Sequence, residues 1–301
     1  MIDITFNKVA TQLYPNAVKL NSTKASNNST PVSQKLLFQI PEENLLTFAD
    51  IVLFAINYYF AKSSKNLLIL TVNKSSTFWE KNLNIISALI GDSENNQFIE
   101  VQSSETCILN KDEYIKDLIE EEFAYPCFCD QENISAIFTS QTIRNKKLGY
   151  YGQWAKCRSL SLADIQENIK AKKTFKIRLM EKGDNHIIIN EDQSYTSAFK
   201  TFLYCLNLDI SLLIIGEGTE QLDQLKILNK SSLSKTKQII NFESISIIHS
   251  KKVEENELIN MGLNLDAVLE YIFMTIDSKF TEWRRTNSSA DIYSYKGFDI
   301  N

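Results

Sequence analysis

Apolar residues in the first third of the chain form short continuous runs separated by helical stretches. KLLFQI at 35–40 and NLLILTV at 66–72 have the length of strands, and DIVLFAINYYFAK at 50–62 lies between them as an apolar helix. A strand, a helix and a second strand in this order predict a βαβ unit, with parallel strands buried on both faces. An amphipathic helix at 78–92 and a short strand at 97–102 extend the same order. The expected fold class is therefore α/β with a parallel sheet.

After residue 110 the pattern of apolar and polar residues predicts both helices and strands, without the regular alternation of the first third. Residues 112–125 show helical spacing with an acidic face, and CRSLSLADIQENI at 157–169 has a cap-like serine before a further amphipathic helix. The remaining predicted elements are strands at 175–180, 185–190 and 239–248. Residues 1–34 contain a Ser/Asn/Thr-rich run and are expected to form a flexible extension, and the tail after 279 is expected to be irregular.

Composition narrows the functional classes. Only 8 glycines and 4 prolines among 301 residues argue against a turn-rich β architecture. The net charge of −5 argues against a globally basic nucleic-acid binder, so DNA is not an expected partner. A chain with this net charge can still carry a local basic face. Five cysteines without a secretory signal fit a reducing compartment. No apolar run approaches the roughly 20 residues of a membrane span. We therefore expect a cytoplasmic chain with no membrane partner.

The carboxyl ends of the first two strands are where a parallel sheet would bind a ligand. The sequence there is QIPEENLLTFAD at 39–50 and TVNKSS at 71–76, with neither a glycine-rich turn nor a histidine. Glu42, Glu43 and Asp50 place negative charge where a phosphate would have to lie, at the start of the following helix. These residues argue against nucleotide binding at the first crossover.

A cysteine group in the middle of the chain has the spacing of a metal site. Cys127 and Cys129 are one residue apart, and Cys157 follows a helix-like segment and two tyrosines, Tyr150 and Tyr151. Three thiolates and one further donor can hold a tetrahedral metal. Reduced cysteines are also common core residues, so a site without metal stays open at this stage.

The order of elements over residues 113–180 resembles an insertion in one enzyme family. Helix, C-x-C, helix, aromatic turn, cysteine, helix and basic strand follow one another as in bacterial-type glutamyl-tRNA synthetases and, equally, in glutamyl-queuosine-tRNA(Asp) synthetases. YPCFC at 125–129 is the most specific match. NYYFAKSSKNLLILTVN at 57–73 and the L-D-A-V-L-E-Y helix at 265–271 also resemble the family. The resemblance covers roughly residues 36–275.

The resemblance implies a class I aminoacyl-tRNA synthetase fold. Its parts would be a Rossmann-like core with a parallel sheet, an inserted connective subdomain resembling a zinc knuckle, and a C-terminal helical segment without an anticodon-binding domain. The expected ranges are an extension at 1–34, the first half of the core at 35–110, the insertion at 111–182, the second half of the core at 183–250, and the helical segment and tail at 251–301.

The catalytic signatures of that family have no counterpart here. Thr47–Asp50 stands where the family has its HIGH signature, and Thr71–Ser76 where it has an acidic run. Neither His186 nor His249 can serve as the HIGH histidine, and Ile215 replaces a substrate arginine. No catalytic residue is assigned. The leading hypothesis is a catalytically degenerate paralogue that binds the acceptor stem of a tRNA or a protein partner. A divergent, active ATP-dependent glutamate–tRNA ligase and a purely structural subunit are the alternatives.

Site residues follow from the same resemblance. ATP would bind only if activity is retained, and zinc would be structural. The nucleotide-binding candidates are Gly216, Glu217, Ser250, Lys251 and Lys252. The tRNA-binding candidates are Lys146, Lys147, Arg158, Lys172, Lys173 and Arg178. The metal-binding candidates are Cys127, Cys129, Cys157 and, as the fourth ligand, Tyr151.

Overall fold

The structure is a computed structural model, and it divides the chain into two compact units. It describes residues 4–18, 34–91, 96–108, 110–181, 183–216, 219–234, 236–241 and 264–295. Unit 1 comprises residues 1–27, 108–203 and 220–234, and unit 2 comprises residues 28–107, 204–219 and 235–301. None of the helices that the structure describes combines the length and the apolar character needed to cross a membrane.

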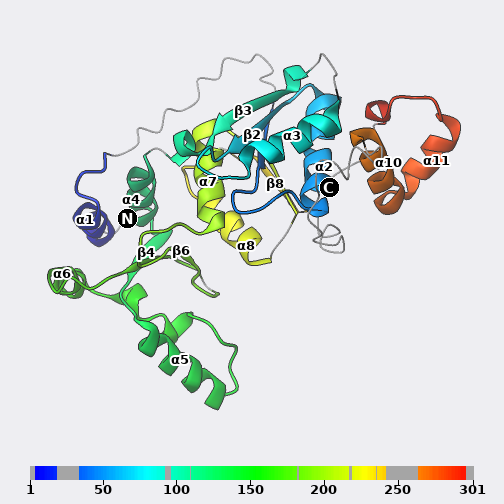
Figure 1. The fold of residues 1–301 in the computed structure, drawn as a ribbon. Coiled ribbons are helices and arrows are strands. Elements are labelled where there is room, and N and C mark those ends of the chain that lie inside the picture. The colour runs from blue at the N-terminus through cyan, green and yellow to red at the C-terminus, as the bar shows by residue number, and fades with distance from the viewer. Residues whose placement is uncertain are drawn as a thin grey trace. The chain divides into compact units, whose positions relative to one another are not determined.

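Unit 2 contains a five-stranded parallel sheet with the strand order β3-β2-β1-β7-β8 (Figure 1). The order reverses direction between β1 and β7, as in doubly wound folds. Apolar runs without alternation form these strands because both faces of a parallel sheet are covered. Their bounds are β1 Lys35–Gln39, β2 Leu67–Val72, β3 Ile99–Ser103, β7 Leu212–Ile215 and β8 Gln238–Asn241.

Helix α2 (Phe48–Ser64) makes the first crossover and is buried along most of its length. Helix α3 (Trp79–Ile90) follows β2 and buries Ile85, Ile86 and Leu89 in the same core. The predicted βαβ unit is therefore present, with helix and strand bounds within two residues of those expected.

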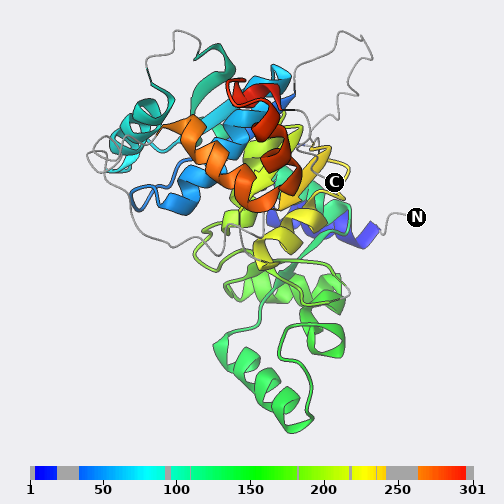
Figure 2. The same cartoon turned by 90° about the vertical axis from the view of Figure 1, so that its right-hand side faces the viewer.

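Helix α10 (Leu265–Ile276) packs against α2, and helix α11 (Ser278–Thr286) follows it directly (Figure 2). The expectation of an irregular tail is wrong for residues 279–286. Phe280 is fully buried, and its ring lies 5.2 Å from that of Phe273, which anchors this otherwise polar helix. Arg284 also forms a bidentate ion pair with Glu270 of α10, with N···O distances of 2.8 and 2.7 Å.

Helix α1 (Ile4–Leu13) in unit 1 corrects the expectation of a flexible extension over residues 1–34. It packs against helix α4 (Lys111–Glu120), burying Val9 and Ala10. Lys116 Nζ donates a hydrogen bond to the carbonyl of Ala17 at 2.8 Å. Local composition could not show this helix, because its stability comes from a partner about 100 residues later in the chain. Residues 19–33 lie outside the described residues.

The rest of unit 1 is built on a three-stranded antiparallel sheet, β4-β5-β6. The strands are β4 Ala124–Cys127, β5 Lys176–Leu179 and β6 Ile187–Ile189. Helix α5 (Gln131–Ile143) leaves the end of β4, and Figures 1 and 2 show it running away from this sheet. We call residues 130–156 the arm. The short helices η3 (Gly152–Trp154) and η4 (Lys156–Ser159) return the chain to helix α6 (Leu162–Lys170).

Helix α6 begins at a serine N-cap. Ser161 Oγ accepts a hydrogen bond from the amide of Asp164, whose carboxylate accepts one from the amide of Ser161. This reciprocal pair is a capping box, and it confirms the prediction of a serine cap before this helix. The remaining helices are α7 Ser197–Leu208 and α8 Thr219–Leu228.

Candidate functional site

The first candidate site is the carboxyl edge of the parallel sheet in unit 2. Strands β1 and β7 are parallel neighbours, so the loop after Gln39 and the buried Gly216 after β7 lie at the same edge. This is the point where the strand order reverses and where open α/β sheets bind their ligands. Of the five nucleotide-binding candidates, Gly216 is placed here. Glu217, Ser250, Lys251 and Lys252 lie outside the described residues.

The loop from Pro41 to Leu46, at the same edge, is held by a buried asparagine on helix α3. Asn82 is fully buried, and its Nδ2 donates to the carbonyls of Pro41 at 3.1 Å and Asn44 at 3.0 Å. Its Oδ1 accepts a hydrogen bond from the amide of Leu46 at 3.0 Å. One side chain therefore satisfies three backbone groups of the loop, and the loop is fixed by the protein itself.

The same loop is tied to the segment that follows β2. Asn73 Nδ2 donates to Glu42 Oε2 at 3.2 Å, and the hydroxyl of Ser76 donates to the carbonyl of Glu42. Both segments that would contact a ligand at this edge are thus engaged with each other. Sequence analysis identified Glu42 only as a negative charge and did not single out Asn82.

The start of helix α2 is occupied by its own side chains. The Asp50 carboxylate accepts hydrogen bonds from the amide of Thr47 at 2.7 Å and from its hydroxyl at 2.6 Å. In return, Thr47 Oγ1 accepts from the amide of Asp50 at 3.2 Å. This capping box places a carboxylate at the positive end of the helix, where an anion would otherwise be favoured. Of the three acidic residues expected at this position, Asp50 lies at the start of α2, whereas Glu42 lies in the preceding loop with Asn73 and Ser76.

Replacing Asn82 with alanine should release the Pro41–Leu46 loop. We expect a loss of about 3 kcal/mol in stability, because three backbone groups of the loop lose their partner, among them the buried amide of Leu46. Hydrogen exchange at the amide of Leu46 should become faster through local opening of the loop, without unfolding of the whole protein. Asn84→Ala on the exposed face of the same helix is the matched control and should change stability by less than about 0.5 kcal/mol. Equal effects of the two substitutions would contradict the role given to Asn82.

The second candidate site is the cysteine cluster in unit 1. Cys127 ends strand β4, Cys129 immediately precedes helix α5, and Cys157 lies in η4. Their three Sγ atoms all lie within 4.8 Å of one another, and those of Cys129 and Cys157 are 3.5 Å apart. All three side chains are buried, with 1 to 8% of each residue exposed. The residues singled out from their spacing therefore converge in space.

The fourth polar group in this cluster is Tyr150. Its hydroxyl lies 3.2 Å from Cys129 Sγ and accepts a hydrogen bond from the amide of Cys157 at 3.2 Å. Tyr151, the candidate fourth ligand from the sequence, instead donates its hydroxyl hydrogen to the carbonyl of Lys147. The neighbouring tyrosine is therefore the one brought to the thiols. A doublet of identical side chains carries no signal in the sequence that tells one from the other.

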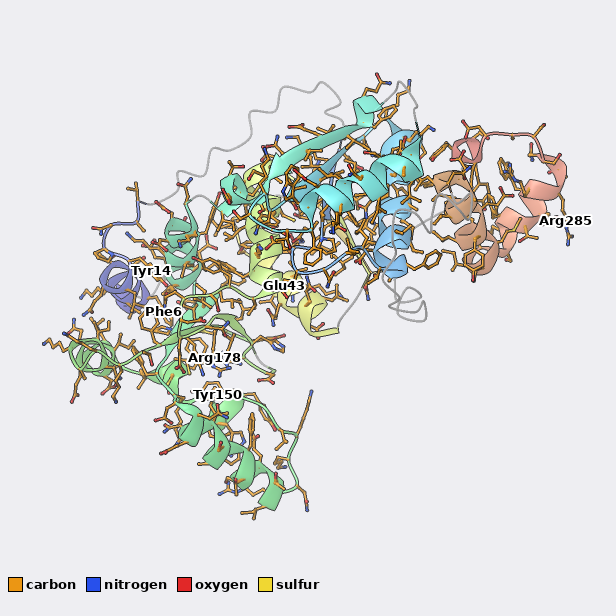
Figure 3. All side chains as sticks on the ribbon, viewed as in Figure 1. Phe6, Tyr14, Glu43, Tyr150, Arg178 and Arg285 are labelled. Carbon is orange, nitrogen blue, oxygen red and sulfur yellow. The ribbon has the colours of Figure 1, made fainter. Side chains whose placement is uncertain are left out.

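Tyr150 is held in place by contacts on both sides. The guanidinium carbon of Arg178 lies 4.3 Å from the centre of its ring, and Figure 3 shows the two side chains next to each other. The amide of Tyr150 donates to Asp184 Oδ1 at 2.8 Å. Gly149 allows this approach, since a Cβ there would lie 2.8 Å from Asp184 Oδ2. The position of the hydroxyl is thus determined by the surrounding backbone.

Hydrogen bonds and charge divide the three thiols into unlike groups. The pKa of the Cys127 thiol is held far below its usual range, because Cys129 and then Cys157 donate hydrogen bonds to its sulfur, with Arg178 adding a favourable charge. The pKa values of Cys129 and Cys157 are raised, first of all by their hydrogen bonds to Cys127. Burial is the main reason that the pKa of Tyr150 is raised. The three thiols and Tyr150 therefore titrate as one coupled group, in which Cys127 is the thiol favoured to lose a proton.

The donor set fits a tetrahedral metal ion. Metal–sulfur bonds of about 2.3 Å in a tetrahedron place the sulfur atoms about 3.8 Å apart, close to the separation of Cys129 and Cys157. Three sulfurs and the Tyr150 hydroxyl supply four donors. The cluster could therefore hold a metal ion without large movement of its side chains.

The candidate tRNA-binding residues separate into two groups. Lys146, Lys147, Lys172 and Lys173 have exposed side chains, the first two on the arm and the others after α6. Arg158 is half-buried and donates to the carbonyl of Glu181 at 3.0 Å. Arg178 is only 6% exposed, stacks on Tyr150 and donates to the carbonyl of Asn185 at 2.8 Å, so it supports the cluster from inside. Strand alternation alone did not show that Arg178 faces inward.

Comparison with known proteins gives consistent matches. No protein-family model matches the chain. It is 25% identical to the glutamate–tRNA ligase of Acetivibrio thermocellus over 220 residues, covering 62% of this chain and 40% of that ligase. It is 40% identical to the Sorangium cellulosum glutamate–tRNA ligase over 72 residues, covering 24% of this chain and 13% of the relative. A glutamate tRNA ligase of Elizabethkingia meningosepticum, solved in complex with its amino acid, matches with a TM-score of 0.55 and 15% identity, covering 69% of this chain and 49% of that one.

The chain is glutamate–tRNA ligase-like. The resemblance stated from its motifs is confirmed, and so is the fold class, a Rossmann-like α/β core of the class I synthetase kind. The chain spans about 40% of the length of the curated relatives that it matches over 220 residues or more. Likeness to these ligases therefore establishes the scaffold, whereas activity has to be argued from this chain's own residues.

Proposed function

We propose that this glutamate–tRNA ligase-like chain does not activate glutamate and acts as a binding module for the acceptor stem of a tRNA. The observation that carries the first half is the carboxyl edge of the parallel sheet. The Thr47–Asp50 capping box fills the start of α2 with a carboxylate, and Asn82 fixes the loop before it. A phosphate there would meet negative charge and backbone groups that already have partners.

Adenylate formation depends on groups that stabilise charge on the phosphates in the transition state. Loss of a single such donor typically costs about 100- to 1000-fold in rate. At the HIGH position this chain has Thr47–Asp50, of which Thr47 and Asp50 are committed to each other. The acidic run after β2 is replaced by Thr71–Ser76, in which Asn73 and Ser76 hold Glu42. The loss of both signatures supports a protein that has kept the scaffold and not the reaction.

Glutamate-dependent ATP–pyrophosphate exchange tests this proposal directly. The assay is run with total tRNA present and with an active glutamate–tRNA ligase in parallel. We expect exchange at least about 1000-fold below that of the active enzyme, because several charge-stabilising groups are missing together. Circular dichroism confirms that the chain is folded. Clear exchange would overturn the proposal and would identify a divergent ligase, with Lys251→Ala/Lys252→Ala as the next variant.

The second half of the proposal concerns the arm. Lys146 and Lys147 are exposed, and Arg144 lies with its guanidinium carbon 5.3 Å from the ring centre of Trp154. Lysines on an exposed projection, with an aromatic ring beside them, suit the phosphates and bases of a nucleic acid end. A protein partner is the other outcome. It would be shown by stable capture of a protein with no affinity for tRNA.

We further propose that the cysteine cluster binds zinc through Cys127, Cys129, Cys157 and the Tyr150 hydroxyl. Zinc favours tetrahedral sites rich in thiolate, and this set is closed and buried as in structural sites. The ion would join β4, the start of α5 and η4, and so hold the base of the arm. Its role is structural, and no chemical step passes through it.

A further inference from the structure

Cys129 and Cys157 lie at the two ends of the arm. Cys129 directly precedes the N-cap of α5, Asp130, and Cys157 belongs to η4, where the chain returns. Their Sγ atoms are 3.5 Å apart. A disulfide requires the two sulfurs to move from this separation to about 2.05 Å. We propose that this pair forms a reversible disulfide whenever the cluster holds no metal.

A surface groove distinguishes Cys129 from Cys127 and Cys157, which do not line it. Cys129 lines a surface groove of about 460 Å³ beside α5, together with Trp154 and Lys156. Cys129 is 7% exposed and Cys157 is 8% exposed, whereas Cys127 is 1% exposed. A small oxidant can therefore reach the sulfur of Cys129 from the groove. Cys157 is the thiol placed to resolve the oxidised product.

The chemistry balances with a peroxide as oxidant. Cys129 loses its proton and its Sγ attacks one peroxide oxygen. The O–O bond breaks and the released hydroxide takes up a proton, so that a sulfenic acid and one water result. Cys157 Sγ then attacks the Cys129 sulfur, so that the S–S bond forms, the S–O bond breaks and a second water leaves. Two thiols lose two electrons and two protons in total, and one hydrogen peroxide becomes two waters. A dithiol reductant reverses the change.

The disulfide and the metal would exclude each other. The bond withdraws two of the three sulfurs, leaving only Cys127 and the Tyr150 hydroxyl to hold an ion. The metal-bound cluster and the disulfide both join the same two ends of the arm. The metal would hold the base of the arm under reducing conditions, and the disulfide would hold it under oxidising conditions when the metal is absent. This inference does not depend on glutamate activation or on tRNA binding.

Peptide mapping of the full chain tests the proposal. The purified chain is stripped of metal with a chelator, treated with hydrogen peroxide, alkylated and digested with trypsin. Cleavage after Lys156 and Arg158 releases Cys157 in the dipeptide Cys157–Arg158, and cleavage after Lys116 and Arg144 releases fragment 117–144. We expect two of the five free thiols to disappear and the dipeptide to be joined to fragment 117–144. That fragment contains both Cys127 and Cys129, so fragmentation in the mass spectrometer must place the alkyl label on Cys127 and the bond on Cys129, and a bond to Cys127 would overturn the proposal. Dithiothreitol should restore five thiols.

Variants and metal loading complete the test. Cys157→Ser should remove the cross-link and leave oxidised Cys129, while Cys107→Ser, with its cysteine outside the cluster, should keep the cross-link. Chain preloaded with zinc should keep its thiols longer than the stripped chain. A Cys127–Cys129 bond, sulfinic acid at Cys129 with Cys157 still free, or no thiol loss in the stripped chain would each overturn the proposal. Because mapping is done on the unsubstituted chain, a variant that fails to fold does not affect the result.

Discussion

Replacing Tyr150 with phenylalanine is expected to weaken zinc binding by at least about 10- to 100-fold, because loss of a group that only hydrogen-bonds to a ligand already costs that much and Tyr150 is proposed as a ligand. Tyr151→Phe is expected to leave it unchanged. The two residues are neighbours with the same side chain, yet only the Tyr150 hydroxyl lies 3.2 Å from Cys129 Sγ. The Tyr151 hydroxyl is engaged with the carbonyl of Lys147. The pair therefore gives a control that is matched in chemistry and differs only in position.

Competition titration against a chromophoric chelator measures this effect. Cys157→Ser should abolish stoichiometric binding, because a buried thiolate ligand is lost. Loss of affinity in Tyr151→Phe but not in Tyr150→Phe would contradict the geometry of the cluster. If the unsubstituted chain binds no zinc under reducing conditions, the metal proposal itself is wrong, and the three thiols are core residues.

Reversing the charges of the two arm lysines is expected to weaken tRNA binding and to lower its salt dependence. Each phosphate contact contributes roughly 0.7 to 0.9 to the slope of log affinity against log salt. Lys146→Glu with Lys147→Glu should therefore reduce the slope by about 1.4 to 1.8. Filter binding or fluorescence anisotropy at several salt concentrations gives the slope directly.

The control variant is a second double charge reversal, Lys279→Glu with Arg285→Glu, on helix α11. Both residues are exposed, and the change in net charge is the same (Figure 3 labels Arg285). The control should change the slope much less if the arm is the contact. Equal slopes for both variants would mean that tRNA affinity reflects only net charge, and no tRNA affinity in the unsubstituted chain would favour a protein partner. Arg178 is left unchanged, because its replacement would disturb Tyr150.

Much of the scaffold follows from local pattern alone. The apolar runs at β1 and β2 and the helix between them are read correctly, since strands buried on both faces need continuous apolar sequence. Ser161 marks the start of α6 because capping is satisfied within four residues. The C-x-C spacing and Cys157 predict a group of thiols, and the three sulfurs do meet. The strands, the helix and the cap depend on residues that are neighbours in the chain, and cysteine is a residue type with few other roles.

The remaining features required tertiary contacts. Helices α1 and α11 form because buried residues such as Val9 and Phe280 pack on segments that sequence spacing does not identify. Asn82 looks like any helical asparagine until its three backbone partners come within reach.

The sequence by itself determined the α/β order of elements, the ligase-like motifs and the three thiols. Only the tertiary structure decided which tyrosine joins those thiols and that Arg178 faces inward. The physical reason is that a hydrogen bond or a stacked ring depends on the position of a side chain to within an ångström. Residues distant in the sequence determine that position, and local sequence pattern does not carry it.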